Sequence, residues 1–361
     1  MSLATFIQAM PKVELHVHLE GSIRPETLLV LARRHDIQLP ADTVEGIRAW
    51  YTFTDFPHFI DIYRIISACL RTPDDVELVA REFLAGQASQ NIRHSEVTYT
   101  GYTQFRVNGI PFADQLAAIN RARAWAAQAL GVTMSLTVDI SRDVDAEEGL
   151  MVAGWAIAGL GQGVTALGLG GPEAGNPPEK FQAAFDRARA AGLASLPHAG
   201  EVAGPESIWG ALRALHAVRI GHGVRCLEDP ALVAELRTRQ VPLEVCPTSN
   251  VCLKVVPDIS RHPLPRLLQE GLYVTVNSDD PPMFNTTLTD EYLRVAEAFG
   301  WEAPMFEKLV LSAVRASMLP ADKKHRLEAE FAAEFKRMES EHLSRAVAAA
   351  TSAPPLHAGG E

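Results

Sequence analysis

The sequence has few of the features that mark secreted, membrane-spanning or nucleic-acid-binding proteins. Its 4 cysteines are scattered and form no C-x-x-C pair, so we expect reduced thiols and, for Cys246, plain core packing. No apolar run approaches the roughly 18 residues of a membrane span, and no basic segment with an apolar core opens the chain. We therefore expect a cytoplasmic protein without a secretory signal or a membrane partner. The formal net charge of -11 argues against a nucleic-acid partner.

Strand-forming runs alternate with longer segments of helical periodicity along most of the chain. The expected strands cover residues 13–18, 92–99, 132–140, 164–170, 194–199, 218–222, 241–247 and 273–278. The helical segments between them include 112–130, 178–192, 205–215 and 229–240, and several open with proline or an acidic residue, as helices often do. Alternation of this kind implies parallel strands joined by right-handed crossovers. Eight such strands predict an α/β fold of the (β/α)8 TIM-barrel class.

No low-complexity linker or internal repeat divides the chain, so we predict a single domain over residues 1–349. Residues 289–349 look helical throughout and are expected to flank or close the barrel. The small and turn-forming residues 350–361 predict a flexible C-terminal tail. A doubly wound sheet is the alternative fold, but the G-x-G-x-x-G that would favour it is absent after the first strand.

Polar residues cluster where the predicted strands end. His16 and His18 end the first strand in "VELHVH", and their spacing places both imidazoles on one face. His198, His222 and Asp279 stand at or after the ends of the fifth, sixth and eighth strands. Each has an ordinary structural explanation by itself, as a buried hydrogen-bonded histidine, a turn residue or a helix start. Because the carboxyl ends of all barrel strands form one face, these residues together predict a shared pocket.

Three imidazoles and one carboxylate in such a pocket form a ligand set for a divalent metal. His16, His18 and His198 would supply nitrogen and Asp279 oxygen, which fits zinc best. We therefore predict one Zn2+ per chain. A metal of this kind lowers the pKa of water enough to supply hydroxide near neutral pH. The set predicts a hydrolase without specifying which bond is cut.

Several segments resemble the signature motifs of the adenosine deaminase family, within the amidohydrolase superfamily. They are "MPKVELHVHLEGSIRPETL", "PHAGE" followed by "GPESIW", "RIGHGV", "CPTSN" and "SDDPPMF". The resemblance runs from about Met10 to at least Tyr292, which is most of the chain. It implies a (β/α)8 barrel, one catalytic zinc ion and hydrolytic deamination at C6 of a 6-aminopurine. The H-x-E and P-C-x-x-C elements of the cytidine deaminase type are absent.

The resemblance implies catalytic roles for three residues. Glu201 matches the glutamate of "HAGE", which is protonated, donates to purine N1 and then passes a proton toward the departing ammonia. Such a role requires a carboxyl group with a raised pKa. His222 matches the histidine that orients the attacking water. Asp279 matches the metal ligand that also contacts this water.

The resemblance also implies substrate contacts. Asp280 matches the carboxylate that faces purine N7. Gly171 falls where the family directs a backbone N–H toward N3, a close approach that glycine permits. His18 and Glu20 are expected to contact the substrate as well, and Glu20 stands where many adenosine deaminases place an aspartate near the ribose.

Adenosine is the expected substrate, converted to inosine and ammonia. Gly221 in "RIGHG" and Thr248 in "CPTSN" resemble the nucleoside-acting members, whereas adenine deaminases usually have an aspartate in place of this glycine. Thr98, Pro172 and Glu20 depart from the adenosine deaminase pattern. These departures resemble bacterial relatives that include aminodeoxyfutalosine deaminases, so aminodeoxyfutalosine and adenine stay open as alternative substrates.

Two features are expected around the mouth of the pocket. Residues 50–63 ("WYTFTDFPHFIDIY") fall where the family has a helical gate, although an amphipathic core helix explains them equally well. Aminodeoxyfutalosine carries a benzoate-bearing extension at the ribose 5′ end, which needs a donor or cation at the mouth. The candidates are Arg64, Arg71 and Arg106.

Two interpretations other than a deaminase stay open: a metal-dependent amide hydrolase, and an inactive barrel that binds a nucleoside. A binuclear hydrolase would need further ligands, for which Glu96 and Asp139 lie near the ends of strands 2 and 3. The intact metal ligands and Glu201 favour an active enzyme with one metal. The sequence does not specify the oligomeric state.

Overall fold

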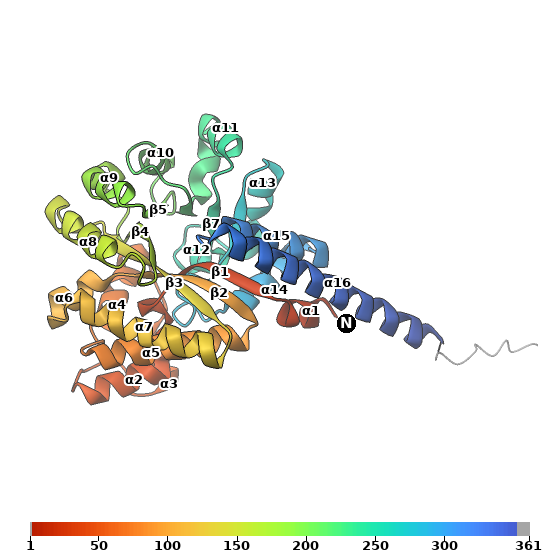
Figure 1. Cartoon of the computed structure of the whole chain (residues 1–361), viewed down its shortest axis with the longest axis horizontal. Coiled ribbons are helices and arrows are strands. Elements are labelled where there is room, and N and C mark those ends of the chain that lie inside the picture. The colour runs from red at the N-terminus through yellow and green to blue at the C-terminus, as the bar shows by residue number, and fades with distance from the viewer. Residues whose placement is uncertain (1, 352–361) are drawn as a thin grey trace, which may run out of the picture.

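Eight parallel strands in chain order form the centre of the computed structural model, which describes residues 2–351 (Figure 1). They are β1 (Lys12–His18), β2 (Ile92–Tyr99), β3 (Thr133–Ser141), β4 (Val164–Gly170), β5 (Ala194–Ala199), β6 (Ile220–His222), β7 (Leu243–Val245) and β8 (Val274–Val276). The sheet closes between β1 and the segment after β8. There the N–H of Asp279 donates to the carbonyl of His16 at 3.1 Å, and the N–H of His18 donates to the carbonyl of Asp279 at 2.9 Å. The predicted (β/α)8 barrel is confirmed.

Helices surround the barrel on its outside (Figure 1). Those up to β8 are α1 (Leu3–Ala9), α2 (Pro25–Arg34), α3 (Val44–Trp50), α4 (Phe56–Ser67), α5 (Pro73–Ser89), α6 (Gly101–Asn108), α7 (Phe112–Ala129), α8 (Ala146–Ala158), α9 (Gln182–Ala190), α10 (Pro205–Arg213), α11 (Pro230–Arg239), α12 (Pro247–Cys252) and α13 (Leu264–Gln269). The start signals in the sequence mark real helix starts, since proline occupies the first turn of α10 and α11. The segment 178–192 differs: it begins as a 3-10 turn, Pro178–Phe181, before α9.

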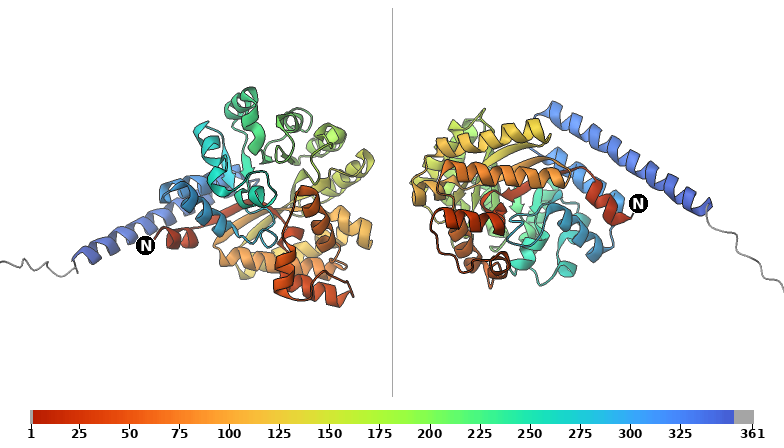
Figure 2. Two further views of the ribbon diagram at one scale, coloured as in Figure 1. Left: turned by 180° about the vertical axis from the view of Figure 1, so that it is seen from behind. Right: turned by 90° about the horizontal axis from the view of Figure 1, so that it is seen from below.

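The helical region after β8 consists of three helices rather than one continuous run. They are α14 (Leu288–Phe299), α15 (Ala303–Ala316) and α16 (Ala321–Thr351). Gly300 ends α14 in the left-handed conformation, with a φ of 64°, and Pro320 precedes α16. Helix α16 runs along the outside of the barrel and projects past the N-terminus (Figures 1 and 2). The expected tail lies outside the described residues, apart from the end of α16.

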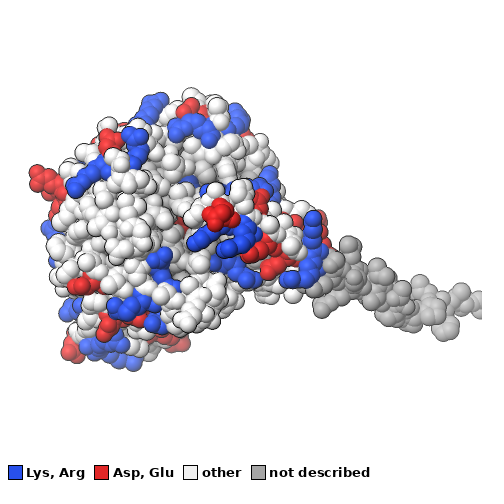
Figure 3. Space-filling view, in the orientation of Figure 1, with Lys and Arg blue, Asp and Glu red and all other residues white. Residues whose placement is uncertain are grey.

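Buried apolar side chains fill the space between the strands and the helices in two clusters. One centres on β2 to β4 and the other on β6 to β8. Within the described residues, no helix combines the length and the apolar character needed to cross a membrane. On the face shown in Figure 3, basic and acidic side chains intermingle.

The segment expected to form a gate, residues 50–63, contains the last residue of α3, the loop after it and most of α4. Phe53 is buried and packs against Phe59 and Phe284, with ring centroids 5.3 and 5.8 Å apart. Phe56 and Phe59 of α4 line the pocket at the carboxyl ends of the strands. The aromatic residues of the segment therefore join the core and also line the pocket, and a role as a gate stays a prediction.

Candidate functional site

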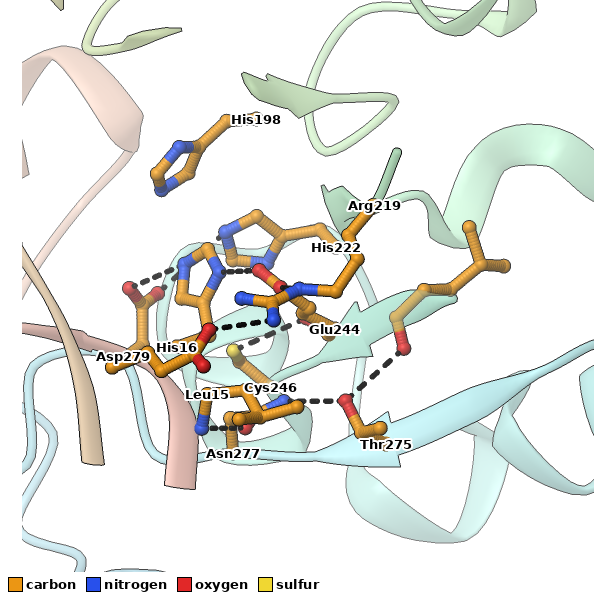
Figure 4. Close-up of polar contacts among 12 residues, drawn as sticks. Leu15, His16, His198, Arg219, His222, Glu244, Cys246, Thr275, Asn277 and Asp279 are labelled. Atoms are coloured by element: carbon orange, nitrogen blue, oxygen red, sulfur yellow. Dashed lines mark hydrogen bonds and ion pairs between the residues drawn. The ribbon is translucent and has the colours of Figure 1, made fainter. Parts of the chain in front are cut away.

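The histidines and the aspartate predicted to bind metal converge at the carboxyl ends of the strands. Figure 4 shows His16, His198 and Asp279 of this set. His16, His18, His198 and Asp279 each offer one ligand atom, and these four atoms lie within 4.8 Å of one another. The Nε2 atoms of His18 and His198 are 3.1 Å apart. Oδ1 of Asp279 lies 3.4 Å from Nε2 of His16 and 3.3 Å from Nε2 of His18. These four ligand-type atoms thus point at one another rather than at separate partners.

The outward-facing nitrogens of two of these histidines are held by groups behind the site. Nδ1 of His16 is 2.8 Å from Oε2 of Glu244, and Nδ1 of His198 is 3.1 Å from the carbonyl of Leu169. Metal-binding histidines usually donate their second ring N–H in this way, which leaves the other nitrogen free to bind the ion. Nε2 of His16 is buried and has no hydrogen-bond partner. The residues therefore fit a divalent metal with nitrogen and oxygen ligands.

The surrounding carboxylates make this position strongly attractive to cations. Burial opposes protonation of His16, but the neighbouring carboxylates of Asp279 and Glu244 outweigh it and raise its pKa to about 9. For His18, burial is likewise outweighed, by Asp280 and Asp279, and its pKa rises to about 10. A divalent ion displaces protons from such ligands when it binds. The same negative potential that holds these protons would therefore favour a metal.

A second group of ligand-type atoms overlaps the first. It consists of His16, His222, Cys246 and Asp279. Burial and the neighbouring carboxylates raise the pKa of the Cys246 thiol well above its usual range, so the thiol stays neutral. Cys246 is fully buried, as expected from its apolar surroundings in the sequence. Because both groups share His16 and Asp279, they describe one metal position.

Glu201 lies beside this cluster with His222. Oε1 of Glu201 is 3.7 Å from Nε2 of His222, which in turn lies 3.8 Å from Oδ2 of Asp279. Burial, together with the charges of Asp279 and Glu173, raises the pKa of Glu201 well above its usual range. The raised pKa favours the protonated form of this carboxyl group, which is the form that a proton donor needs.

His222 is held in a strained and neutral state. Its φ of 61° places it in the left-handed region, which costs a non-glycine residue roughly 1–3 kcal/mol. Burial, and after it the charged imidazoles of His16 and His18, lower its pKa to about 3 despite Asp279. Nδ2 of Asn250 lies 3.4 Å from its Nδ1. With this contact at Nδ1, the ring proton belongs on Nε2, which faces Glu201.

Two further residues hold the site and were not found from the sequence. The carboxylate of Glu173 accepts four backbone N–H groups at 2.6–3.1 Å, those of Gly200, Glu201, Val202 and Ala203. This fixes the turn after β5 that carries Glu201. Asn250 connects His222 to His262, whose Nε2 is 3.1 Å from Oδ1 of Asn250. An acidic residue after the paired glycines in "LGLGGPE", and the asparagine in "CPTSN", were the available signals.

The expected substrate residues differ in their access to the pocket. His18, Gly171 and Asp280 line it. The space between the lining side chains is about 670 Å³, part of it open to solvent. Glu20 is fully buried behind the wall, where it accepts a hydrogen bond from the N–H of Thr100 at 2.9 Å and one from the hydroxyl of Tyr63 at 3.3 Å. A contact between Glu20 and a substrate stays a prediction.

Asp280 depends on the absence of a side chain at Gly21. A Cβ atom at position 21 would lie 1.6 Å from Oδ1 of Asp280, so no other residue fits there without displacing this carboxyl group. Burial and the charge of Asp279 raise the pKa of Asp280 well above its usual range. Oδ1 of Asp280 is buried without a hydrogen-bond partner. Asp280 is therefore a buried carboxyl group in the pocket wall whose surroundings favour its protonated form.

The two candidates for a second metal lie outside the cluster. Oε2 of Glu96 binds Nη1 of Arg219 at 2.6 Å, and its other oxygen accepts the N–H of Met318. Asp139 lines the pocket, but it belongs to neither group of ligand-type atoms. The described side chains thus offer one metal position.

A family model for adenosine deaminase matches residues 11–334. The chain belongs to the adenosine deaminase family. An aminodeoxyfutalosine deaminase of Streptomyces coelicolor is 41% identical to it over 331 residues, which are 91% of this chain and 85% of that protein. The resemblance noted in the sequence is confirmed.

Two solved structures resemble this adenosine deaminase family member closely. An adenine deaminase from Arthrobacter aurescens matches with a TM-score of 0.87 at 35% identity, covering 91% of this chain and 100% of that one. An amidohydrolase from Burkholderia ambifaria with bound Zn matches with a TM-score of 0.88 at 30% identity, covering 95% of this chain and 96% of that one. The chain is a hydrolytic deaminase of this family, and this membership favours it over a metal-dependent amide hydrolase.

Proposed function

We propose that this deaminase removes the C6 amino group of a 6-aminopurine nucleoside by hydrolysis. One observation carries the proposal: buried Glu201 lies 3.7 Å from His222, which lies 3.8 Å from the metal-ligand candidate Asp279. A proton donor, a neutral imidazole and a metal position therefore meet at one point of the pocket. Hydrolysis at C6 needs all three, because the ring must accept a proton from the donor while a water molecule, activated by the metal and oriented by the imidazole, adds to C6.

The bound metal in this proposal is zinc, one ion per chain, held by His16, His18, His198 and Asp279. Three histidines and a carboxylate suit zinc, and the similar Burkholderia ambifaria amidohydrolase was solved with bound Zn. Such an ion polarises a water molecule and lowers its pKa toward neutrality.

The protein's own residues account for the remaining steps. Glu201 donates its proton to N1 of the purine, which makes C6 more electrophilic. Its carboxylate then takes up a proton from the added water and passes it to the amino group, which leaves as ammonia. His222 orients the attacking water through Nε2. Asp280 retains a proton because of its raised pKa, so it can donate a hydrogen bond to N7, which is an acceptor. Gly171 presents its backbone N–H to N3 in the same plane.

The space around Gly221 favours a nucleoside over adenine. A Cβ atom at this position would lie 2.7 Å from Cε1 of His16 and 3.1 Å from Cα of His198. The aspartate usual in adenine deaminases would displace these metal-ligand candidates. Thr248, the other residue typical of nucleoside-acting members, is buried and bonded to Glu291 and Arg294 away from the pocket, so it bears on the substrate less directly.

Between the two nucleosides, we propose aminodeoxyfutalosine as the better substrate and adenosine as the second candidate. The Streptomyces coelicolor relative is an aminodeoxyfutalosine deaminase. Phe56, Phe59 and Ile60 give the mouth an apolar wall, which suits an aromatic 5′ extension. Of the departures from the adenosine deaminase pattern, Pro172 lines the pocket, whereas Thr98 and Glu20 do not.

Steady-state kinetics with zinc-loaded protein test this function. The kcat/KM values for aminodeoxyfutalosine, adenosine and adenine are measured by release of ammonia. We expect aminodeoxyfutalosine to give the largest value and adenosine a smaller one. Efficient deamination of adenine, with neither nucleoside turned over, would contradict the proposal.

A further inference from the structure

Arg64 is the single lysine or arginine among the described residues that line the pocket. The other ionisable groups there are the imidazoles and carboxyl groups of the site and the phenol of Tyr63. Helix α4 carries Arg64 next to Tyr63, whose ring lies 6.1 Å from that of His18. One turn earlier, Phe59 and Ile60 form part of the apolar wall. A cation and an apolar wall therefore line the same pocket as the metal-ligand candidates.

The present partners of Arg64 hold it weakly. Its Nη2 lies 2.5 Å from Oδ2 of Asp143, in the segment after β3, and its Nη1 lies 3.9 Å from Oδ1 of Asp61. The side chains of Arg64 and Asp143 are 50% and 41% exposed. Ion pairs this exposed are screened by water and contribute little to stability. A carboxylate on a bound molecule can therefore take the place of Asp143.

We propose that Arg64 determines specificity by binding a carboxylate on the 5′ substituent of the nucleoside. The planar guanidinium binds a carboxylate through two parallel N–H donors. Phe56 and Phe59 would pack against an aromatic ring that connects this carboxylate to the ribose. The inference rests on the proposed function and specifies its substrate class: a 6-aminopurine nucleoside extended by an aryl carboxylate.

The other two arginines considered at the mouth do not line the pocket. Arg106 on α6 donates to the hydroxyl of Tyr102 at 2.7 Å and to Glu148. The backbone N–H of Arg71 donates to Asp75 at 3.1 Å, in the turn before α5. Arg106 is therefore a matched control, since it is exposed, paired with a carboxylate and near the gate, but does not reach the pocket.

The test compares the variants Arg64→Ala, Arg64→Lys, Asp143→Asn and Arg106→Ala with the unchanged protein. Each is assayed on aminodeoxyfutalosine, adenosine and adenosine 5′-monophosphate. Arg64→Ala should raise KM for aminodeoxyfutalosine about 10- to 100-fold, as expected for the loss of a charge-assisted hydrogen-bonded pair. The kcat for this substrate and the kcat/KM for adenosine should stay near their original values.

The other three variants test the charge, the competing carboxylate and the specificity of the effect. Arg64→Lys keeps the charge but not the paired donors. Its KM for aminodeoxyfutalosine should therefore fall between those of the unchanged protein and Arg64→Ala. Asp143→Asn removes the competing carboxylate and should lower KM for aminodeoxyfutalosine only. Arg106→Ala should change nothing.

Three results would overturn the inference. An equal loss on aminodeoxyfutalosine and adenosine would show that Arg64 only supports the gate. A preference for the monophosphate that is lost in Arg64→Ala would show that Arg64 binds a phosphate rather than a carboxylate. If the unchanged protein deaminates adenine but neither nucleoside, the proposed function itself fails and this inference fails with it.

Discussion

Replacing Glu244 by glutamine tests how the protein supports its metal ligands from behind. Oε2 of Glu244 lies 2.8 Å from Nδ1 of His16, and its Oε1 accepts a hydrogen bond from Nε of Arg219. All three side chains are buried. Figure 4 shows this chain of contacts running from Asp279 through His16 to Glu244 and Arg219. Glutamine has nearly the same shape, so the change removes charge rather than volume.

The expected cost to metal binding follows from this geometry. The amide oxygen of glutamine can still accept the ring N–H of His16, but a neutral acceptor makes the imidazole a weaker ligand. Loss of such supporting contacts typically lowers metal affinity about 10- to 100-fold, which corresponds to about 1.4–2.7 kcal/mol. The amide nitrogen would also face the donor Nε of Arg219, which adds a stability cost that is separate from the metal.

Glu96→Gln provides the matched control. Glu96 is the other carboxylate on Arg219, at 2.6 Å from Nη1, and it makes no contact with a metal ligand. Competition with a chromogenic chelator gives the zinc Kd of each variant, and urea unfolding of the metal-free proteins gives their stability. We expect both variants to lose stability and only Glu244→Gln to lose zinc affinity. Equal zinc affinity in the two variants would refute the reasoning.

Three further predictions follow from other parts of the structure. Gly21→Ala should displace the carboxyl group of Asp280 and lower kcat/KM about 10- to 100-fold while metal content stays constant; unchanged kinetics would contradict the role of this glycine. Asp139→Asn should retain about one equivalent of zinc by metal analysis, because Asp139 belongs to neither ligand group, and loss of the ion would make it a ligand. Burial alone would raise the pKa of Glu96, but Arg219 outweighs it and lowers that pKa from 4.5 to about 2. The stability that this pair contributes is therefore complete above pH 4.5 and lost as the pH falls toward 2, about 3 kcal/mol in total. Urea unfolding at several pH values should show this loss in the unchanged protein and a smaller one in Glu96→Gln.

The order of the strands and the place of the metal ligands could be predicted because both follow from local patterns. His16, His18 and His198 stand at the ends of strand-forming runs, and barrel topology brings all such ends to one face. The predicted strands at 218–222 and 241–247 are longer than β6 and β7, which have three residues each. Residues beyond the strand ends are also buried, so apolar patterning alone overestimates the length of the hydrogen-bonded strands.

The parts that could not be predicted depend on contacts between distant loops. Glu173 is 27 to 30 residues away from the N–H groups that it accepts, and no local pattern indicates this pairing. The hydrogen bonds that the carboxylate of Glu20 accepts from Thr100 and Tyr63 were likewise not indicated by a local pattern. The left-handed conformations of His222 and Asp279, with φ of 61° and 65°, are likewise imposed by the closed barrel rather than by residue preference.

The central claim is that Glu201 transfers a proton beside a bound metal but is not itself a metal ligand. The most direct test is to measure zinc content and turnover of aminodeoxyfutalosine and adenosine in one preparation of Glu201→Gln. We predict about one equivalent of zinc and a loss of kcat of at least about 100-fold, as is usual when a general acid is removed. Turnover near that of the unchanged protein, with zinc still bound, would contradict the account.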